Sequence, residues 1–346
     1  MKTKITLLAL VAISLFSCKK DKEDEPTPST GFNTTSSGIL INNEGGFNLG
    51  NASITYSDGT VAGTFQDIYK QVNSEDLGDI CQSMVKYNGN IYLVVNNSSK
   101  IEVVSASTFK KVGTITGMSS PRFLLPVSGN KAYVSDLFSN QISVVDLSTR
   151  AITSHIDLSG SSEDMLILNN KVYVTNLSTS YLYVIDAATD VLEDSILIGP
   201  GGNSIQVDAD NKLWVLCGGD FSPTGPASLH KVDPVTKTDE LGLTFPIPDY
   251  PTRLKINGAG DEIYFINTNV YKMSTSETTL PATAFIDAAG KSFYGLGCDK
   301  INNQFYVSDG IDFQQAGRVY KYDSSGNEIS SFPAGVIPGD FLFLNN

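Results

Sequence analysis

The chain has 346 residues, of which only 18% are charged, and its formal net charge is −13. This acidic balance gives it no electrostatic reason to bind nucleic acid or an anionic membrane surface, so neither class of partner is expected. The length is sufficient for a large buried core and would by itself suggest two domains.

Residues 1–17 have the pattern of a signal peptide. Lys2 and Lys4 precede an apolar run from Ile5 to Phe16, which is too short to span a bilayer as a stable helix. The run ends in Leu-Phe-Ser-Cys, which resembles a bacterial lipobox. We therefore expect cleavage before Cys18 and acylation of that cysteine. The alternative is an ordinary secretory signal that happens to contain a cysteine.

Residues 18–37 predict a flexible tether. The segment after Cys18 is charged and rich in Pro, Ser and Thr, with little to bury: KKDKEDEPTPSTGFNTTSS. Its acidic part, KEDE, resembles the export signal that sends lipoproteins of Bacteroidetes to the outer cell surface. We expect an outer-membrane lipoprotein that is exposed at the cell surface and contacts the membrane only through its lipid anchor.

Residues 38–346 contain a repeat that occurs seven times. A short apolar strand is followed, usually about a dozen residues later, by a second apolar strand that ends in Asp or Ser and a turn. In six copies the first strand carries a central aromatic residue: Tyr92, Tyr133, Tyr173, Trp214, Tyr264 or Tyr306. The second strands end at Asp58, Ser105, Asp146, Asp186, Asp233, Ser274 and Asp323. A period of about 44 residues with several strands per unit predicts an all-β, seven-bladed propeller.

Each unit is expected to hold four strands, which in one copy are 123–127, 131–135, 141–145 and 151–158. The two middle strands are nearly continuous apolar runs, as sheets covered on both faces require. The first unit lacks an initial strand, whereas one extra apolar strand, 339–344, follows the last unit. We expect this C-terminal strand to pair into the first blade, because that closes the ring and removes both sheet edges.

The sequence offers little for catalysis. It has no phosphate-binding loop, Gly-x-Ser-x-Gly elbow or His-Glu-x-x-His helix, and its two histidines, His155 and His230, fall in predicted strands. We therefore predict a protein that is not an enzyme and carries no cofactor or metal. Three cysteines beside apolar strands are expected to be buried free thiols: Cys81, Cys217 and Cys298.

Insertions indicate a binding face. The distance from the aromatic residue of the first strand to the Asp or Ser of the second is 13 residues in units two, three and four. It is 19 residues in unit five and 17 in unit seven, and unit one is similarly long. The loops between these strands emerge on the same face of a propeller as the connections between blades. Insertions confined to one face of a repeat array often mark its binding surface.

Aromatic, amide and charged residues fall together in the loops of this face. Such a mixture suits a polar, partly planar ligand, because it combines stacking surfaces with hydrogen-bonding groups. Asn, Asp and Gly also fill loops simply because they tolerate turns. The candidate ligand-binding residues are Asn43, Glu44, Phe47, Asn97, Arg122, Phe138, Tyr181, Phe221, Tyr250, Phe293 and Phe313.

Three segments carry a family resemblance: INNEGGFNLGNASITYSDG, VNNSSKIEVVSASTFKKVGTI and VYVTNLSTSYLYVIDAATDVLEDSI. They resemble the YncE-like propeller lipoproteins of Bacteroidetes, a group that includes the BtuG-type surface lipoproteins. The resemblance covers essentially the whole mature chain and implies a seven-bladed propeller on the cell surface. BtuG-type members capture cobalamin and pass it to a TonB-dependent outer-membrane transporter.

The leading hypothesis is a binding lipoprotein whose loop-rich face captures a small molecule, such as a corrinoid, a siderophore or another metal chelate. A TonB-dependent transporter is the expected partner. The first alternative is a surface interaction or scaffold propeller that binds protein or glycan. A weaker alternative is a calcium-assisted hydrolase, because an Asp- and Asn-rich face is compatible with a calcium site.

Overall fold

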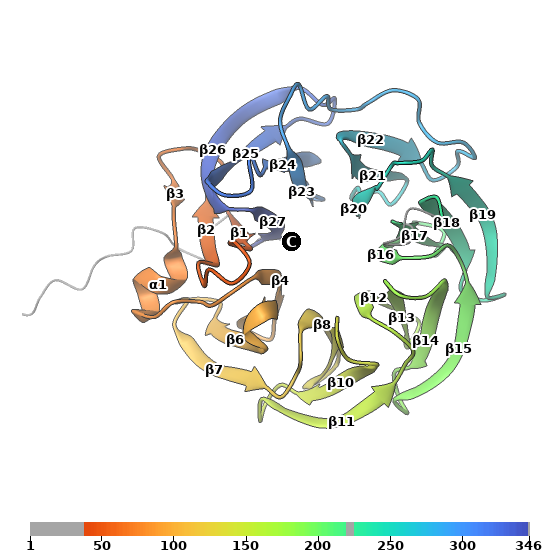
Figure 1. The fold of residues 1–346 in the computed structure, drawn as a ribbon, viewed down its shortest axis with the longest axis horizontal. Coiled ribbons are helices and arrows are strands. Elements are labelled where there is room, and N and C mark those ends of the chain that lie inside the picture. Colours follow the sequence, from red (N-terminus) through yellow and green to blue (C-terminus); the bar gives the residue numbers. More distant parts are fainter. Residues whose placement is uncertain (1–37, 219–224, 345–346) are drawn as a thin grey trace, which may run out of the picture. The chain divides into compact units, whose positions relative to one another are not determined.

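The computed structural model describes residues 38–218 and 225–344, all within one compact unit. They form seven antiparallel sheets arranged around a common centre (Figure 1). The innermost strands contact one another in an unbroken cycle, which runs through β27, β4, β8, β12, β16, β20 and β23 and returns to β27. The predicted seven-bladed propeller is therefore confirmed. The expected signal peptide, tether and lipidated Cys18 lie outside the described residues, as does Phe221.

The strands are given from the innermost to the outermost of each blade. Blade 1 contains β27 (Pro338–Phe343), β1 (Ile39–Asn43), β2 (Ser53–Ser57) and β3 (Thr64–Phe65). Blade 2 contains β4 (Cys81–Tyr87), β5 (Asn90–Val95), β6 (Lys100–Ser105) and β7 (Lys111–Thr116). Blade 3 contains β8 (Pro121–Ser128), β9 (Lys131–Asp136), β10 (Gln141–Asp146) and β11 (Ala151–Asp157). Blade 4 contains β12 (Ser162–Leu168), β13 (Lys171–Asn176), β14 (Tyr181–Asp186) and β15 (Val191–Leu197).

Blade 5 contains β16 (Gly202–Val207), β17 (Leu213–Cys217), β18 (Ser228–Asp233) and β19 (Thr238–Thr244). Blade 6 contains β20 (Thr252–Ile256), β21 (Glu262–Asn267) and β22 (Asn269–Ser274). Blade 7 contains β23 (Phe293–Asp299), β24 (Gln304–Asp309), β25 (Ala316–Tyr322) and β26 (Glu328–Val336). Two short helices interrupt the strands: α1 (Ile68–Asn73) and the 3-10 helix Asn96–Ser98.

The repeated residues are scaffold, as expected. Tyr133 is fully buried and packs in an apolar cluster with Val172 and Ile185 of the next blade, so each sheet is covered by its neighbours. Asp146, at the end of a third strand, accepts hydrogen bonds from the backbone N–H groups of Ser148 and Thr149 at 2.8 and 3.3 Å. A short carboxylate at this position therefore fixes the turn into the outermost strand.

The ring is closed by the C-terminal strand. β27 pairs antiparallel with β1, with Phe343 opposite Ile39 and Phe341 opposite Ile41. The two strands lie side by side at the inner side of blade 1 (Figure 1). Leu344 extends the pairing by donating its N–H to the carbonyl of Gly38 at 3.0 Å. The predicted closure is therefore confirmed, and the inner edge of β1 is covered.

Blade 6 departs from the predicted four strands. Its outer position is taken by an irregular segment, 275–292, which touches β22 through a single bridge between Val270 and Ile286. Ile286 and Ala288 are nevertheless buried in the cluster shared with blade 7, so packing replaces most of the missing ladder. The connection between blades 1 and 2 also carries an insertion, which contains α1. The spacing had suggested that insertions occur only in loops within blades. The segment with α1 shows that the connections between blades carry insertions too.

No helix in the described ranges is long and apolar enough to cross a membrane.

Candidate functional site

Every inner strand contains a β-bulge near its first residues. The register against the second strand of the blade slips by one residue in each of the seven pairs, for example between Cys81 and Ser83 in blade 2. A bulge leaves one residue unpaired and re-aims its side chain. Six of the side chains at these bulges line a single cavity at the centre of the ring: Gln82, Arg122, Glu163, Asn203, Arg253 and Tyr294.

The seventh bulge carries no side chain. In β27 the slip falls at Gly339, whose position is filled by a carboxylate from the loop between β1 and β2. A Cβ built on Gly339 would lie 2.6 Å from Oε1 of Glu44. Glu44 therefore completes the ring of inward-facing groups from a different element of the same blade.

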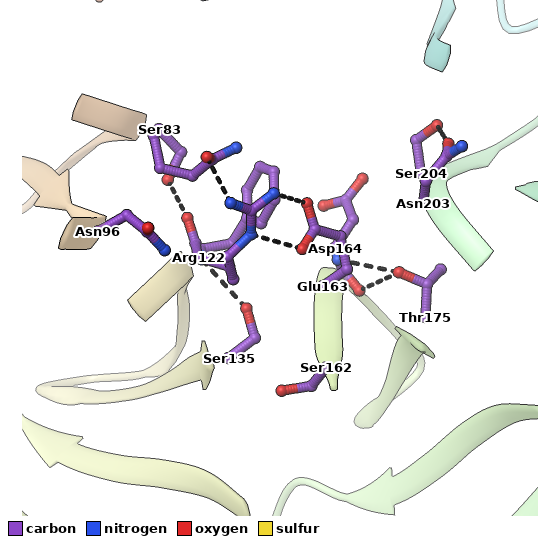
Figure 2. A network of polar contacts seen from close by, with 12 residues as sticks. Ser83, Asn96, Arg122, Ser135, Ser162, Glu163, Asp164, Thr175, Asn203 and Ser204 are labelled. Atoms are coloured by element: carbon purple, nitrogen blue, oxygen red, sulfur yellow. Dashed lines mark hydrogen bonds and ion pairs between the residues drawn. The ribbon is translucent and has the colours of Figure 1, made fainter. Parts of the chain in front are cut away.

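Arg122 is held by its neighbours on both sides (Figure 2). Its Nε donates to Oε2 of Glu163 at 2.6 Å, and its Nη2 donates to Oε1 of the same carboxylate at 2.5 Å. Nη1 donates to Oε1 of Gln82 at 2.6 Å. Burial opposes the charge on Arg122, but the Glu163 carboxylate outweighs it and holds the pKa of the guanidinium above its usual value. Blades 2, 3 and 4 are thus joined across the cavity by one side chain.

A second ion pair lies across the cavity. Arg253 donates its Nη2 to Oε1 of Glu44 at 3.1 Å, and Tyr294 donates its hydroxyl to Oε2 of the same carboxylate at 2.8 Å. The Arg253 guanidinium also lies 5.0 Å from the centroid of the Tyr294 ring, which is a cation–π distance. Arg253 has a φ of 61°, so its backbone is held in the left-handed region by the bulge.

Three further charged groups lie deeper in the cavity. Lys255 donates to Oδ1 of Asp340 at 3.1 Å. The Asp164 carboxylate accepts the N–H groups of Met165 at 2.8 Å and Ile205 at 3.1 Å. Burial is the main influence on Asp164 and raises its pKa to about 6. Asp164 is therefore expected to change protonation state in a mildly acidic medium.

The cavity has a volume of about 540 Å³, in the range of small-molecule sites. Its outer rim is aromatic: Phe47 is 69% exposed and Phe138 is 77% exposed, and Tyr250 completes this side of the lining. The inner part holds the hydrogen-bonded ion pairs described above. The arrangement can therefore hold a molecule that presents an apolar surface to the rim and hydrogen-bonding groups to the interior.

The structure brings six of the eleven sequence-predicted residues together around this cavity: Glu44, Phe47, Asn97, Arg122, Phe138 and Tyr250. Phe313 lies just behind it, with its ring packed edge-on against Tyr294 at a centroid distance of 5.5 Å. Tyr181 is half-exposed at the start of β14 and packs on Tyr183 instead.

Two predicted loop residues lie in strands. Asn43 is the last residue of β1 and fully buried, and its amide bonds Thr55 at 3.0 Å and the N–H of Gly335 at 2.8 Å. Phe293 is the first residue of β23 and packs in the core shared with blade 6. Sequence alone placed both in loops because their neighbours are turn-forming residues.

Sequence reasoning did not place Gln82 and Tyr294 on the binding face. Glu163, Asn203 and Arg253 could be assigned to the loops of that face from the sequence, but they were not among the candidate ligand-binding residues. A signal for them was present, because each is the second residue of an inner strand. In these units the second residue of the inner strand is polar or aromatic, and it lies between the first residue of the strand and the apolar residues that follow. Only the bulge explains why that position faces the centre.

The remaining chemistry-bearing residues are satisfied elsewhere. His230 contacts Asp239 through Nδ1 at 2.7 Å and Ser228 through Nε2 at 2.8 Å, within the buried face of blade 5. Cys81, Cys217 and Cys298 are buried free thiols, as expected. In the ranges that the structure describes, no three His, Cys, Asp or Glu side chains lie close enough to hold a metal ion.

Several solved structures share this fold. A quinonprotein alcohol dehydrogenase-like protein from Bacteroides thetaiotaomicron is 15% identical, with a TM-score of 0.71 over 91% of this chain and 79% of its own. A putative 6-phosphogluconolactonase from Bacteroides fragilis is 11% identical, with a TM-score of 0.67 over 91% of this chain and 99% of its own. A functionally unknown protein from Desulfotomaculum acetoxidans is 13% identical, with a TM-score of 0.64 over 89% and 99%. Likeness at these identities concerns the fold alone.

No curated protein shows significant sequence similarity to this chain. A family model does match, over residues 37–336, which spans the propeller from before β1 to the end of β26. The chain therefore belongs to the family described as Domain of unknown function (DUF5074).

Proposed function

We propose that this protein is a binding protein, without catalytic activity, that captures a small molecule in the central cavity. The observation that carries the proposal is the convergence of six bulge side chains on one cavity of about 540 Å³ beneath exposed aromatic residues. Exposed rings such as Phe138 contribute nothing to the core, whereas they would lose water-exposed apolar surface on contact with a ligand.

The charges in the cavity favour a ligand without net charge. Arg122 is paired with Glu163, Arg253 with Glu44, and Lys255 with Asp340. An anionic ligand would have to displace one of these carboxylates, and a cationic ligand one of the cations, at the cost of leaving a buried charge unpaired. A neutral molecule with amide or hydroxyl groups can instead add hydrogen bonds to the existing pairs.

A cobalamin-like cofactor has the required chemistry, because a corrinoid combines a broad macrocycle with uncharged amide groups at its edge. Ferric siderophores with net negative charge fit the paired charges less well. The lipobox-like sequence at Cys18 and the resemblance to YncE-like lipoproteins support a surface lipoprotein that delivers such a ligand to a TonB-dependent outer-membrane transporter.

The test is isothermal titration calorimetry of the purified full chain with cyanocobalamin, a neutral ferric siderophore and an anionic one. We expect a Kd in the micromolar range or tighter for the corrinoid and weaker binding of the anionic chelate. Failure of all three to bind below millimolar concentration would contradict the proposal. Tight binding of the anionic chelate alone would contradict the argument from paired charges.

A second candidate function is a surface interaction module. It is favoured by the apolar side chains that protrude beside the cavity on the loop between β1 and β2, where Phe47 and Leu49 are each more than two-thirds exposed. Such a patch suits a protein partner. Capture of a glycan or protein through Phe47 and Leu49, with no small molecule bound in the cavity, would favour this function. The described residues provide no observation in favour of calcium-assisted hydrolysis.

A further inference from the structure

A second cavity lies at the opposite ends of the inner strands. It has a volume of about 650 Å³ and is lined by residues of β4, β16, β20, β23 and β27 or directly beyond them. We call it the lower cavity, and the site described above the upper cavity. Lys255 lines both.

The lower cavity is cationic. Its charged lining residues are Lys86, Lys255 and Lys300, and no Asp or Glu is among the lining residues. This differs from the upper cavity, where Arg122 and Arg253 each have a carboxylate partner that also lines the cavity. It also opposes the chain's net charge of −13. A cavity with low-dielectric walls focuses the field of such ammonium groups on its interior.

Two of these lysines have no carboxylate partner within the described part of the chain. Lys86 donates to the carbonyl oxygen of Leu344 at 2.8 Å, which leaves two of its N–H groups for another acceptor. Lys300 has no ion pair there. Lys300 keeps part of its surface in water, but its partial burial is the largest cause that lowers its pKa, and the positive charge of Lys255 acts in the same direction. Lys255 itself is paired with Asp340 at 3.1 Å. An anion in the cavity would offset the repulsion between the positive charges of Lys255 and Lys300.

The rest of the lining is largely apolar. Phe341 and Phe343 of β27, Ile256 of β20 and Met84 of β4 contribute to it. Gly297 leaves room beside Phe341, because a Cβ at that position would come within 2.8 Å of the ring. Ile256 and Phe341 are already buried, whereas Met84 and Phe343 are partly exposed. An anion with an apolar chain would cover the exposed part of these two side chains, and a small inorganic anion would not.

We propose that the lower cavity binds an amphipathic anion, with its phosphate or carboxylate group between Lys86 and Lys300 and its apolar part against Phe341 and Phe343. None of these four residues lines the upper cavity, and the proposal does not depend on the function proposed for that cavity. Two kinds of molecule present such an anionic group beside an apolar chain: a phospholipid in a bilayer and a soluble amphiphile.

The first described residue lies at the same face. Gly38, which follows residues 1–37 directly, accepts a hydrogen bond from the N–H of Leu344, whose carbonyl oxygen accepts the bond from Lys86. For a chain anchored at Cys18, the lower cavity therefore lies near the point where the tether joins the propeller. A phospholipid headgroup is within the reach of such a tether.

The experiment is calorimetric titration of the purified full chain with octyl phosphate, with octyl glucoside as the uncharged control. Lys300→Gln and Lys86→Gln remove the two lysines without a carboxylate partner. Lys110→Gln is the matched control, because Lys110 is an exposed lysine in the turn before β7 and lies outside the cavity. We expect octyl phosphate to bind with a Kd below about 1 mM, and each cavity variant to weaken binding at least fivefold, with no change for Lys110→Gln.

The second part distinguishes the sources by flotation of the Cys18→Ser chain with phosphatidylglycerol or phosphatidylcholine vesicles. Flotation with phosphatidylglycerol alone, lost in Lys300→Gln, assigns the site to a phospholipid headgroup. Binding of octyl phosphate without flotation assigns it to a soluble amphiphile. The proposal is overturned if octyl phosphate does not bind, if octyl glucoside binds equally well, or if Lys110→Gln weakens binding as much as Lys300→Gln.

Discussion

Glu44 occupies the space that a side chain at Gly339 would fill, with its Oε1 only 2.6 Å from where a Cβ would stand. The same carboxylate bonds Arg253 and Tyr294. Gly339→Ala should therefore displace Glu44 and weaken both bonds. We expect a loss of about 1–3 kcal/mol in the free energy of unfolding, because bonds to a charged group are of that size. Urea denaturation provides the measurement.

A double-mutant cycle identifies the cause. If Gly339→Ala acts by moving Glu44, its effect should largely disappear in a Glu44→Ala background, so the two substitutions should be non-additive. Additive effects would show that alanine at 339 disturbs the backbone of β27 instead.

Removing Glu163 should be more harmful than removing the whole ion pair. Glu163→Ala leaves the Arg122 guanidinium, which is mostly buried, with only Gln82 as a side-chain partner. We expect a cost of about 3 kcal/mol for Glu163→Ala and a smaller cost for Arg122→Leu combined with Glu163→Leu. Urea melts of the two variants test this order. The reverse order would mean that water in the cavity compensates Arg122.

Asp164 should make stability depend on pH in a defined direction. Its pKa is raised from 3.8 to about 6, chiefly by burial, so between pH 4 and 6 the folded chain holds this proton more strongly than the unfolded chain. Its contribution to stability is therefore fully present below pH 4 and is lost as the pH rises through 6. The difference in unfolding free energy between the native chain and Asp164→Asn should fall by up to about 1.4 kcal/mol per pH unit. A difference that stays constant over this interval would contradict the assignment.

The aromatic rim should contribute to binding and not to stability. Phe138→Ser and Phe47→Ser remove side chains that are largely exposed, so we expect changes in stability within about 0.5 kcal/mol. Ligand affinity should fall roughly fivefold for each, which corresponds to about 1 kcal/mol. Val235→Ser is the control, because Val235 is equally exposed in the turn between β18 and β19 but lies outside the cavity. An effect of the control as large as that of Phe138→Ser would contradict a role for the rim.

The three thiols should resist alkylation in the folded chain. Burial is the main cause that raises the pKa of Cys217 to about 12 and that of Cys298 to about 11, and it also raises the pKa of Cys81. In a Cys18→Ser chain at pH 8, we expect no rapid labelling by iodoacetamide until denaturant is added. Cys298 lines the lower cavity, so any slow labelling of the folded chain should occur there first. Mass spectrometry of the labelled peptides checks both points.

The repeat allowed most of the fold to be predicted, because its strands are buried on both faces and their apolar runs are unmistakable. The run that includes Tyr133 falls in β9, and the extra strand at the C-terminus pairs with β1 as expected. The missing outer strand of blade 6 could not be predicted. Ile286 and Ala288 provide the buried apolar side chains that an outer strand would provide, but their segment forms only a single bridge and no ladder of backbone hydrogen bonds.

The cavity was predicted only in part, for a physical reason. Loop residues such as Phe47 and Phe138 are recognisable from insertions and turn signals. Arg253 and Tyr294 instead belong to strands, where a regular register would give their side chains a different direction. A one-residue slip in pairing decides that direction, and hydrogen-bond register is not visible in a single sequence.

Closure by β27 also orders events in time. Of the described strands, β1 is synthesised first and obtains its inner partner only from β27, so blade 1 keeps an open edge until β27 has been made. Pairing over such a separation is slow, since a long stretch of chain must be fixed before it forms. A chain released before β27 would present that edge to other polypeptides, so the closed ring forms only when all seven blades are present.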